Sequence, residues 1–291
     1  MPCVLEHALK SLAQVDPDSP SSELETSLIA IRQLLKALPE HILQSARTGD
    51  DAKHLWTTSR WDGLALGLNQ QTQSAMGLAL SRIPGIPDNQ LPAPTTIPAQ
   101  KHWRHIDTAS SEHALLLCCL TASRDIADEA AWRLLAQLCQ TPFYQRLRVE
   151  LQLGYAVFST LRQIHGQAAI LFGVQSPSTA SGDLLGHIQQ FLESLPMRIE
   201  QLDEASFEQQ RKSLADQFDD ASLSSKDATE LFWQAKLAGH SSDYLEQLII
   251  AIRQLDRQAL LSAAQRLINA EGGWLRLASD PKPNTPWRAA N

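Results

Sequence analysis

Cysteine is scarce in this sequence and is not arranged as a metal or redox motif. The 291 residues include four cysteines, and no two of them form a C-x-x-C pair. Cys118 and Cys119 stand inside the apolar run ALLLCCLTA, which is typical of small buried side chains. Together with the isolated Cys3 and Cys139, this usage excludes a disulfide framework and indicates a reducing compartment.

Positive charge is also in short supply. Lys and Arg number 25 against 32 Asp and Glu, which gives a net charge of -7, and the basic residues form no cluster. A protein that binds nucleic acid needs a basic face to neutralise phosphates. The sequence therefore predicts no nucleic-acid partner.

Long apolar runs are missing as well. No stretch approaches the roughly 18 apolar residues that a membrane helix requires, so no membrane partner is expected. The first residues, MPCVLEHALKSL, have no basic region and include the acidic Glu6, unlike a secretory signal. We therefore expect a cytoplasmic location.

Prolines gather in one segment and indicate a division of the chain. IPGIPDNQLPAPTTIPAQK holds five prolines, which disfavour helices and central strands. We predict a linker over residues 84–101 between a helical remnant of a preceding domain, residues 1–83, and a complete domain, residues 102–291. In the first unit, Ser22 and Glu25 form a capping box, and an apolar stripe follows at Leu28, Ile31, Leu34 and Leu35.

After the linker, patterns typical of strands and helices alternate. Strands are expected at HWRHIDT, HALLLCCLTA, YAVFSTLRQ, QAAILFGVQS and GGWLRLAS. Helices are expected through EAAWRLLAQLCQ, again from Thr141-Pro142, through DLLGHIQQFLESL, from a capping box at Ser206, and in three later segments. This order predicts an α+β fold, an antiparallel sheet with helices packed on one face.

Candidate metal ligands are few. CVLEH, from Cys3 to His7, is one residue away from the zinc motif H-x-x-E-H, with Cys3 in place of the first histidine. The acidic third ligand expected several dozen residues later is missing, and His102 and His105 would point to opposite faces of a strand. We predict no metal site in this chain and interpret Cys3, Glu6 and His7 as the start of a helix.

The segment from Leu147 to Ser159, LRVELQLGYAVFS, has a plain local interpretation. Gly154 would be the left-handed residue just past a helix end, Arg148 a cation favourable to the helix dipole, and Tyr155 the start of a hairpin. An edge strand of that hairpin could add a peptide as an extra strand, but the sequence does not say which strand is the edge.

The same segment resembles a signature of the insulinase/pitrilysin family of zinc peptidases. Leu147-Arg148 and Gln152-Leu153-Gly154-Tyr155 match it in place, and GVQS, FEQQRKSL, LFWQ and LDRQAL extend the resemblance over residues 102–279. The family is built from repeated α+β domains in two halves that close like a clamshell, with the metal in the first half. The resemblance implies that this chain is roughly the last third of such a peptidase. Zinc would then be held by a zinc-bearing N-terminal half, in the same or a separate chain.

The resemblance also implies roles for two catalytic residues. Tyr155 would donate a hydrogen bond to the scissile carbonyl or its oxyanion, and Arg148 would hold a nearby carbonyl of the peptide substrate. The composition and the proline linker are similar to bacterial family members that act in the biosynthesis of pyrroloquinoline quinone (PQQ). Alone, the chain should be inactive.

Two other functions stay open at this point. The chain could be a catalytically inactive scaffold of the same fold that binds a peptide or a partner subunit. It could also be an independent zinc enzyme that uses Cys3, Glu6 and His7.

Overall fold

A computed structural model describes residues 28–43, 60–87, 101–164, 166–218 and 223–284 of the chain. Ser22, Glu25, Cys3, Glu6 and His7, which the sequence singles out, lie outside these residues. Within the described ranges, no helix combines the length and the apolar character needed to span a membrane.

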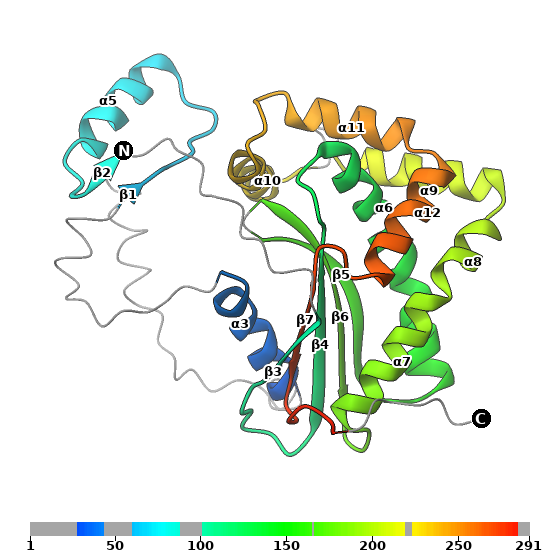
Figure 1. Ribbon diagram of the computed structural model, residues 1–291. Coiled ribbons are helices and arrows are strands. Elements are labelled where there is room, and N and C mark those ends of the chain that lie inside the picture. The colour runs from blue at the N-terminus through cyan, green and yellow to red at the C-terminus, as the bar shows by residue number, and fades with distance from the viewer. Residues whose placement is uncertain (1–27, 44–59, 88–100, 165, 219–222, 285–291) are drawn as a thin grey trace.

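A five-stranded sheet forms the centre of the main unit (Figure 1). Its strands lie in the order β3-β7-β4-β6-β5, so β3 and β5 are the two edges. All neighbouring pairs are antiparallel except β3 and β7, which pair in parallel from Lys101↔Trp274 to His105↔Ala278. The strands are β3 (Lys101–His105), β4 (His113–Leu120), β5 (Ala156–Ile164), β6 (Gln167–Ser176) and β7 (Trp274–Ala278).

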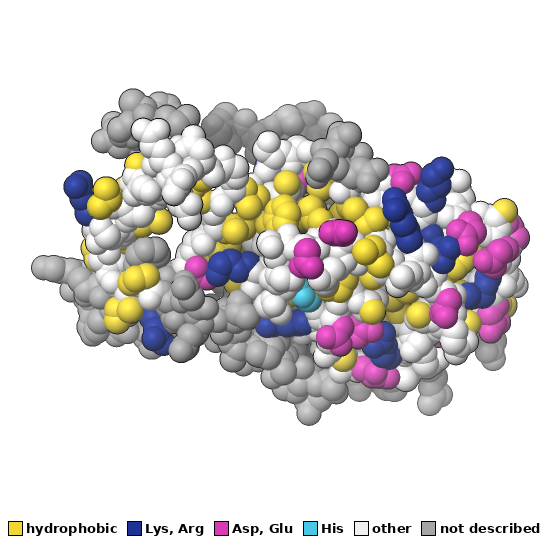
Figure 2. Space-filling view, turned by 90° about the horizontal axis from the view of Figure 1, so that it is seen from above, with side chains coloured by type: hydrophobic (Ala, Val, Ile, Leu, Met, Phe, Trp, Pro, Cys, Tyr) yellow, Lys and Arg dark blue, Asp and Glu magenta, His cyan; other side chains and the backbone are white. Residues whose placement is uncertain are grey.

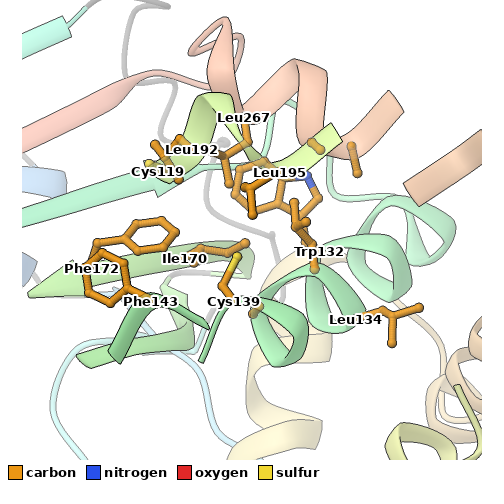
Figure 3. Close-up of a cluster of buried hydrophobic side chains, with 14 of the residues drawn as sticks. Cys119, Trp132, Leu134, Cys139, Phe143, Ile170, Phe172, Leu192, Leu195 and Leu267 are labelled. Atoms are coloured by element: carbon orange, nitrogen blue, oxygen red, sulfur yellow. The ribbon is translucent and has the colours of Figure 1, made fainter. Parts of the chain in front are cut away.

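Helices cover one face of this sheet, and they confirm the predicted α+β class. The layer consists of α6 (Ile126–Tyr144), its π-helical extension η1 (Gln145–Glu150), α7 (Ser181–Glu193), α8 (Leu195–Glu200), α9 (Glu204–Asp216), α10 (Ser225–Ala238), α11 (Tyr244–Gln254) and α12 (Arg257–Ile268). The core between helices and sheet includes Phe143 of α6, whose ring lies beside that of Phe172 (Figure 3). The Phe143 ring meets the rings of Phe172 and Phe191 edge-on, each at a centroid distance of 5.2 Å. Such aromatic pairs add to the stabilisation from burial alone.

One helix lies on the opposite face of the sheet. α3 (Ile29–Leu43) lies against the sheet there (Figure 1). It buries Ile31, Leu34 and Leu38 against side chains of β4, β6 and β7 such as Leu116. The apolar stripe predicted for the first unit therefore faces the sheet of the second. The domain boundaries themselves stay a prediction.

Between α3 and β3, the sequence forms a small unit of two strands and one helix. β1 (Arg60–Trp61) pairs in parallel with β2 (Ile86–Pro87), and α5 (Gln70–Leu80) joins them without burying any residue. β2 falls inside the predicted linker, most of which lies outside the described residues.

Two predicted helix starts are wrong. α6 runs without interruption through Thr141 and Pro142, because the apolar stripe continues on both sides and buries Cys139 and Phe143. α9 begins after Asp203 rather than Ser206, since the Asp203 carboxylate accepts the Ser206 N–H at 2.8 Å. Aspartate at the N-cap satisfies an unpaired backbone donor there.

Candidate functional site

The helix that leads to Tyr155 ends in a wide turn. η1 is a π-helix over Gln145–Glu150, and Leu153 N–H closes it by donating to Leu147 O at 3.0 Å. This bond spans one residue more than the corresponding bond of a Schellman motif, as a π-helical turn requires. Turns of this kind are frequent at functional sites.

Gly154 differs from its predicted role. The left-handed residue after the helix is Gln152, with φ 52°, and not Gly154. Gly154 is needed for another reason: a Cβ there would lie 1.9 Å from the backbone oxygen of Gln175 on β6. The glycine thus lets the chain pass close to β6 immediately before Tyr155.

Tyr155 takes part in a hydrogen-bond network at one end of the sheet. Its hydroxyl donates to a carboxylate oxygen of Glu112 and accepts from Gln175 Nε2 at 2.9 Å. Gln175 Nε2 also donates to Glu112. We call Tyr155, Glu112 and Gln175 the tyrosine network; 37% of Tyr155 is exposed, so the network reaches solvent.

The strand register explains why these three residues meet. Glu112 directly precedes β4, Gln175 lies near the end of β6, and Tyr155 directly precedes β5. β6 lies between the other two strands, and Gln175 pairs with Ala114 on one side and Ala156 on the other. Gln175 therefore bridges the ends of its two neighbours.

Gln175 also connects the network to α3. Its side-chain oxygen accepts the backbone N–H of Ile31, in the first turn of α3, at 3.0 Å. Only 1% of Gln175 is exposed, so both ends of its amide are fixed by hydrogen bonds in the interior.

The surroundings of Tyr155 keep its hydroxyl protonated. Burial and, after it, the Glu112 carboxylate raise the pKa of Tyr155 to about 12, against the opposing hydrogen bond from Gln175. A phenol with such a pKa is a hydrogen-bond donor at neutral pH and not a phenolate.

Arg148 lies on η1, half-buried, at the other side of the same junction. Neighbouring Arg146 pairs with Glu150 at 2.7 Å, whereas Arg148 has no hydrogen bond or ion pair to any residue that the structure describes. The structure therefore places Arg148 and Tyr155 at one helix-to-strand junction without a direct bond between them. Tyr144 and Val149, 44% and 50% exposed, add apolar surface to η1 and the end of α6.

Glu112 and Gln175 were not identified from the sequence. Gln175 had a signal, since it is a polar residue directly after the apolar run AAILFGV. Glu112 had none, because it stands in the loop before β4 and only the strand register brings it to Tyr155.

β5, which follows Tyr155, is an edge strand that pairs with β6 alone among the described strands. A groove of about 680 Å³ runs beside it, between the strand and α9 and α10. Side chains that line this groove include Leu161, Gln163, Phe218, Leu231 and Gln234. The edge and the groove together provide space for an extended peptide.

The described residues do not fit a zinc site. Nowhere in them do three His, Cys, Asp or Glu side chains come close enough to hold a metal ion. His105 Nε2 instead contacts Ser279 O at 3.0 Å, and Cys3, Glu6 and His7 are not described.

Charges of both signs share one face of the molecule. Figure 2 shows Lys and Arg side chains interspersed with Asp and Glu on the face seen from above. A mixed surface of this kind favours solubility over binding to a polyanion.

Two family descriptions match the chain. Residues 1–65 match "PQQ synthase PqqF, C-terminal lobe domain 3", and residues 134–233 match "PQQ synthase PqqF-like, C-terminal lobe domain 4". The second range includes Arg148, Tyr155 and Gln175.

Relatives with curated descriptions agree with these matches. The coenzyme PQQ synthesis protein F of Pseudomonas protegens is 47% identical over 297 residues, which cover 100% of this chain and 36% of the relative. The protein of the same name from Pseudomonas syringae is 42% identical, over 97% of this chain and 36% of its own length. The protein of the same name from Klebsiella pneumoniae is 32% identical, over 74% of this chain and 25% of its own length. The chain thus spans about a third of the length of the first two of these relatives.

Solved structures share the fold at low identity. A protease from Helicobacter pylori has a TM-score of 0.55 at 17% identity, over 74% of this chain and 53% of that one. A peptidase M16 inactive domain from Pseudomonas fluorescens has a TM-score of 0.52 at 17% identity, over 76% of this chain and 53% of that one. Pitrilysin has a TM-score of 0.50 at 22% identity, over 62% of this chain and 19% of that one.

Proposed function

Because the chain belongs to the insulinase/pitrilysin family of peptidases and matches the C-terminal lobe of PqqF, we propose that it is the non-zinc-binding part of a zinc metalloendopeptidase. In this role it closes over a peptide substrate and positions it, while a zinc-bearing N-terminal half supplies the metal. The observation that carries the proposal is the junction between η1 and β5, which presents Arg148 and Tyr155 from rigid elements.

The chemistry of the two side chains suits amide hydrolysis. A peptide carbonyl oxygen gains negative charge when its carbon is attacked. Tyr155 remains protonated and partly exposed, so its O–H can donate to that oxygen in exchange for its bond to Glu112. The Arg148 guanidinium, with no partner among the described residues, would hold a neighbouring substrate carbonyl by a charge-assisted bond.

The edge strand supports a role in holding an extended peptide. β5 begins directly after Tyr155, so a peptide added along its free edge would pass the tyrosine. Main-chain hydrogen bonds would give affinity, and the groove beside Leu161 and Gln163 would take side chains.

The named relatives suggest the pathway. Each is a coenzyme PQQ synthesis protein F, so we propose that the substrate is a precursor peptide of PQQ or a fragment of it. The low cysteine content supports a cytoplasmic location.

Reconstitution with a zinc-bearing half tests the proposal. The purified chain is mixed with, or fused to, the N-terminal half of such a peptidase, and hydrolysis of a peptide is followed. We expect Tyr155→Phe to lower kcat about 100-fold or more, as loss of one oxyanion donor does elsewhere. Arg148→Ala should lower kcat and also raise KM, because it removes a contact that the bound substrate makes before the reaction.

Matched controls separate these effects from general damage. Tyr144→Phe removes a hydroxyl from an exposed tyrosine of α6, and Arg253→Ala removes an exposed arginine of α11. Both should leave turnover unchanged. Full turnover in the Tyr155→Phe and Arg148→Ala variants would contradict the assigned roles.

A scaffold without chemistry is the second candidate, and the edge strand with its groove favours it, because peptide binding there needs no reactive group. It predicts zinc-independent peptide binding and no gain in turnover from any zinc-bearing partner.

A further inference from the structure

The tyrosine network has a feature that the proposed roles leave unused: the proton of Tyr155 is already engaged. A phenol has a single O–H, and here it donates to Glu112. The bond from Gln175 occupies a lone pair of the same oxygen, so it offers no second proton. A substrate carbonyl can therefore receive the Tyr155 proton only if it displaces the Glu112 carboxylate.

The acceptor is held in place by the fold. Glu112 N–H donates to Ser110 Oγ at 3.2 Å, and its carboxylate receives Gln175 Nε2 as well as Tyr155. Gln175 is in turn fixed by Ile31 of α3. The Glu112 carboxylate is thus a built partner of the tyrosine and not a side chain that meets it by chance.

The strength of competing acceptors decides which of them takes the proton. A carboxylate accepts a hydrogen bond more strongly than a neutral amide carbonyl does, because the bond is charge-assisted. The oxygen of an attacked peptide bond also carries negative charge, so it can displace Glu112 where the neutral carbonyl of the substrate cannot. Glu112 should therefore withhold Tyr155 from the bound substrate and release it as the oxyanion develops.

We propose that Glu112 is a positioning residue that restrains the Tyr155 hydroxyl and makes its hydrogen bond selective for the transition state. Interactions that form only in the transition state raise kcat, whereas those already formed with the substrate lower KM. This inference rests on the proposed function, in which Tyr155 faces a scissile carbonyl.

The test is a double-mutant cycle in the reconstituted enzyme. Glu112→Gln keeps the shape of the side chain but makes it a weaker hydrogen-bond acceptor. The substrate carbonyl should then receive the hydrogen bond from the Tyr155 hydroxyl. We expect KM to fall and kcat/KM to rise, each by about threefold to tenfold, the range set by one modest hydrogen bond. In a Tyr155→Phe background the same substitution should change neither value, because the two residues act as one unit.

A second readout uses the chain alone and needs no activity. The chain has three tyrosines, Tyr144, Tyr155 and Tyr244, and subtracting the ultraviolet titration of Tyr155→Phe isolates the signal of Tyr155. The pKa of Tyr155 should drop from about 12 toward the ordinary value of 10.0 in Glu112→Gln, and stay in place in Glu246→Gln, which alters an exposed carboxylate of α11.

The outcomes distinguish the two proposals. If Tyr155→Phe leaves hydrolysis unchanged, the proposed function fails, whatever Glu112 does. If Tyr155→Phe reduces hydrolysis but Glu112→Gln lowers kcat/KM, leaves it unchanged, or acts equally in both backgrounds, the restraint is wrong and the proposed function stands.

Discussion

At the scale of single residues, Gly154 shows how the absence of one side chain determines the position of the next residue, Tyr155. The backbone oxygen of Gln175 fills the space that a Cβ would need, 1.9 Å away, and backbone cannot move aside as a side chain can. We expect Gly154→Ala to lower the free energy of unfolding by about 1–3 kcal/mol, the usual cost of overpacking. Urea titration of the purified chain measures this.

Gly77 supplies the comparison for that substitution. It lies inside α5, and a Cβ there would meet nothing within 4 Å. Gly77→Ala should therefore be neutral or slightly stabilising, since alanine is the better helix former. If Gly154→Ala were as stable as Gly77→Ala, the close approach of β6 to the Tyr155 segment would be wrong.

At the scale of elements, Asp280 ties the end of β7 to three neighbours. Its carboxylate accepts the Ser181 N–H at the start of α7 at 2.8 Å and contacts His113 Nδ1 of β4 at 2.9 Å. Its backbone oxygen accepts Trp103 Nε1 of β3 at 3.2 Å. Burial raises the pKa of Asp280, but the hydrogen bonds from Ser181 and His113 outweigh it, so the pKa lies below its ordinary value of 3.8.

This depressed pKa gives stability a defined dependence on pH. The folded state favours the ionised carboxylate, so the contribution is complete above the ordinary pKa of 3.8 and is lost as the pH falls through the lower folded pKa. Asp280→Asn should lower the free energy of unfolding near neutral pH. On acidification, this variant should lose less of its free energy of unfolding than the unaltered chain does. Urea titrations at about pH 7 and about pH 3 measure both effects. Asp216→Asn, at the exposed end of α9, should keep the full acid response.

The elements also show what the sequence can predict. Helical periodicity and turn residues are local signals, so α6, α7, α10, α11, α12 and the hairpin of β5 and β6 were predictable. The start of α9 was misplaced, and the short α8 was not predicted. The parallel pairing of β3 with β7 joins residues far apart in sequence, and no local pattern encodes it. For the same reason the stripe of α3 could be recognised, but not the sheet face that it covers.

The same difference between local and long-range signals decides which residues of the candidate site could be predicted. Arg148 and Tyr155 were found because they belong to one short motif. Glu112 was not, because its partners lie on other strands and only the register brings them together. Gly154 was identified with the wrong reason, since a glycine's local signal does not distinguish a left-handed turn from a close approach.

At the scale of the whole molecule, the chain spans about a third of the length of the first relatives. α3 packs on one face of the sheet, the helix layer covers the other, and the edge of β5 borders the groove. Under the proposed function, we expect the surface that faces the substrate at the junction of η1 and β5, where the end of the sheet is partly exposed.

The last prediction concerns the zinc that the proposed function assigns to a separate N-terminal half. A zinc site requires three or four converging ligands, and the described residues contain no such group. The purified chain should therefore bind far less than one zinc ion per molecule, as measured by elemental analysis. A chelator should leave its thermal unfolding midpoint unchanged, because a ligand that does not bind the folded state cannot stabilise it. The same chelator should abolish hydrolysis by the reconstituted enzyme, since there the zinc-bearing half holds the metal. Stoichiometric zinc that disappears in His7→Ala would instead assign a site to Cys3, Glu6 and His7, and would contradict the division of labour proposed for the two halves.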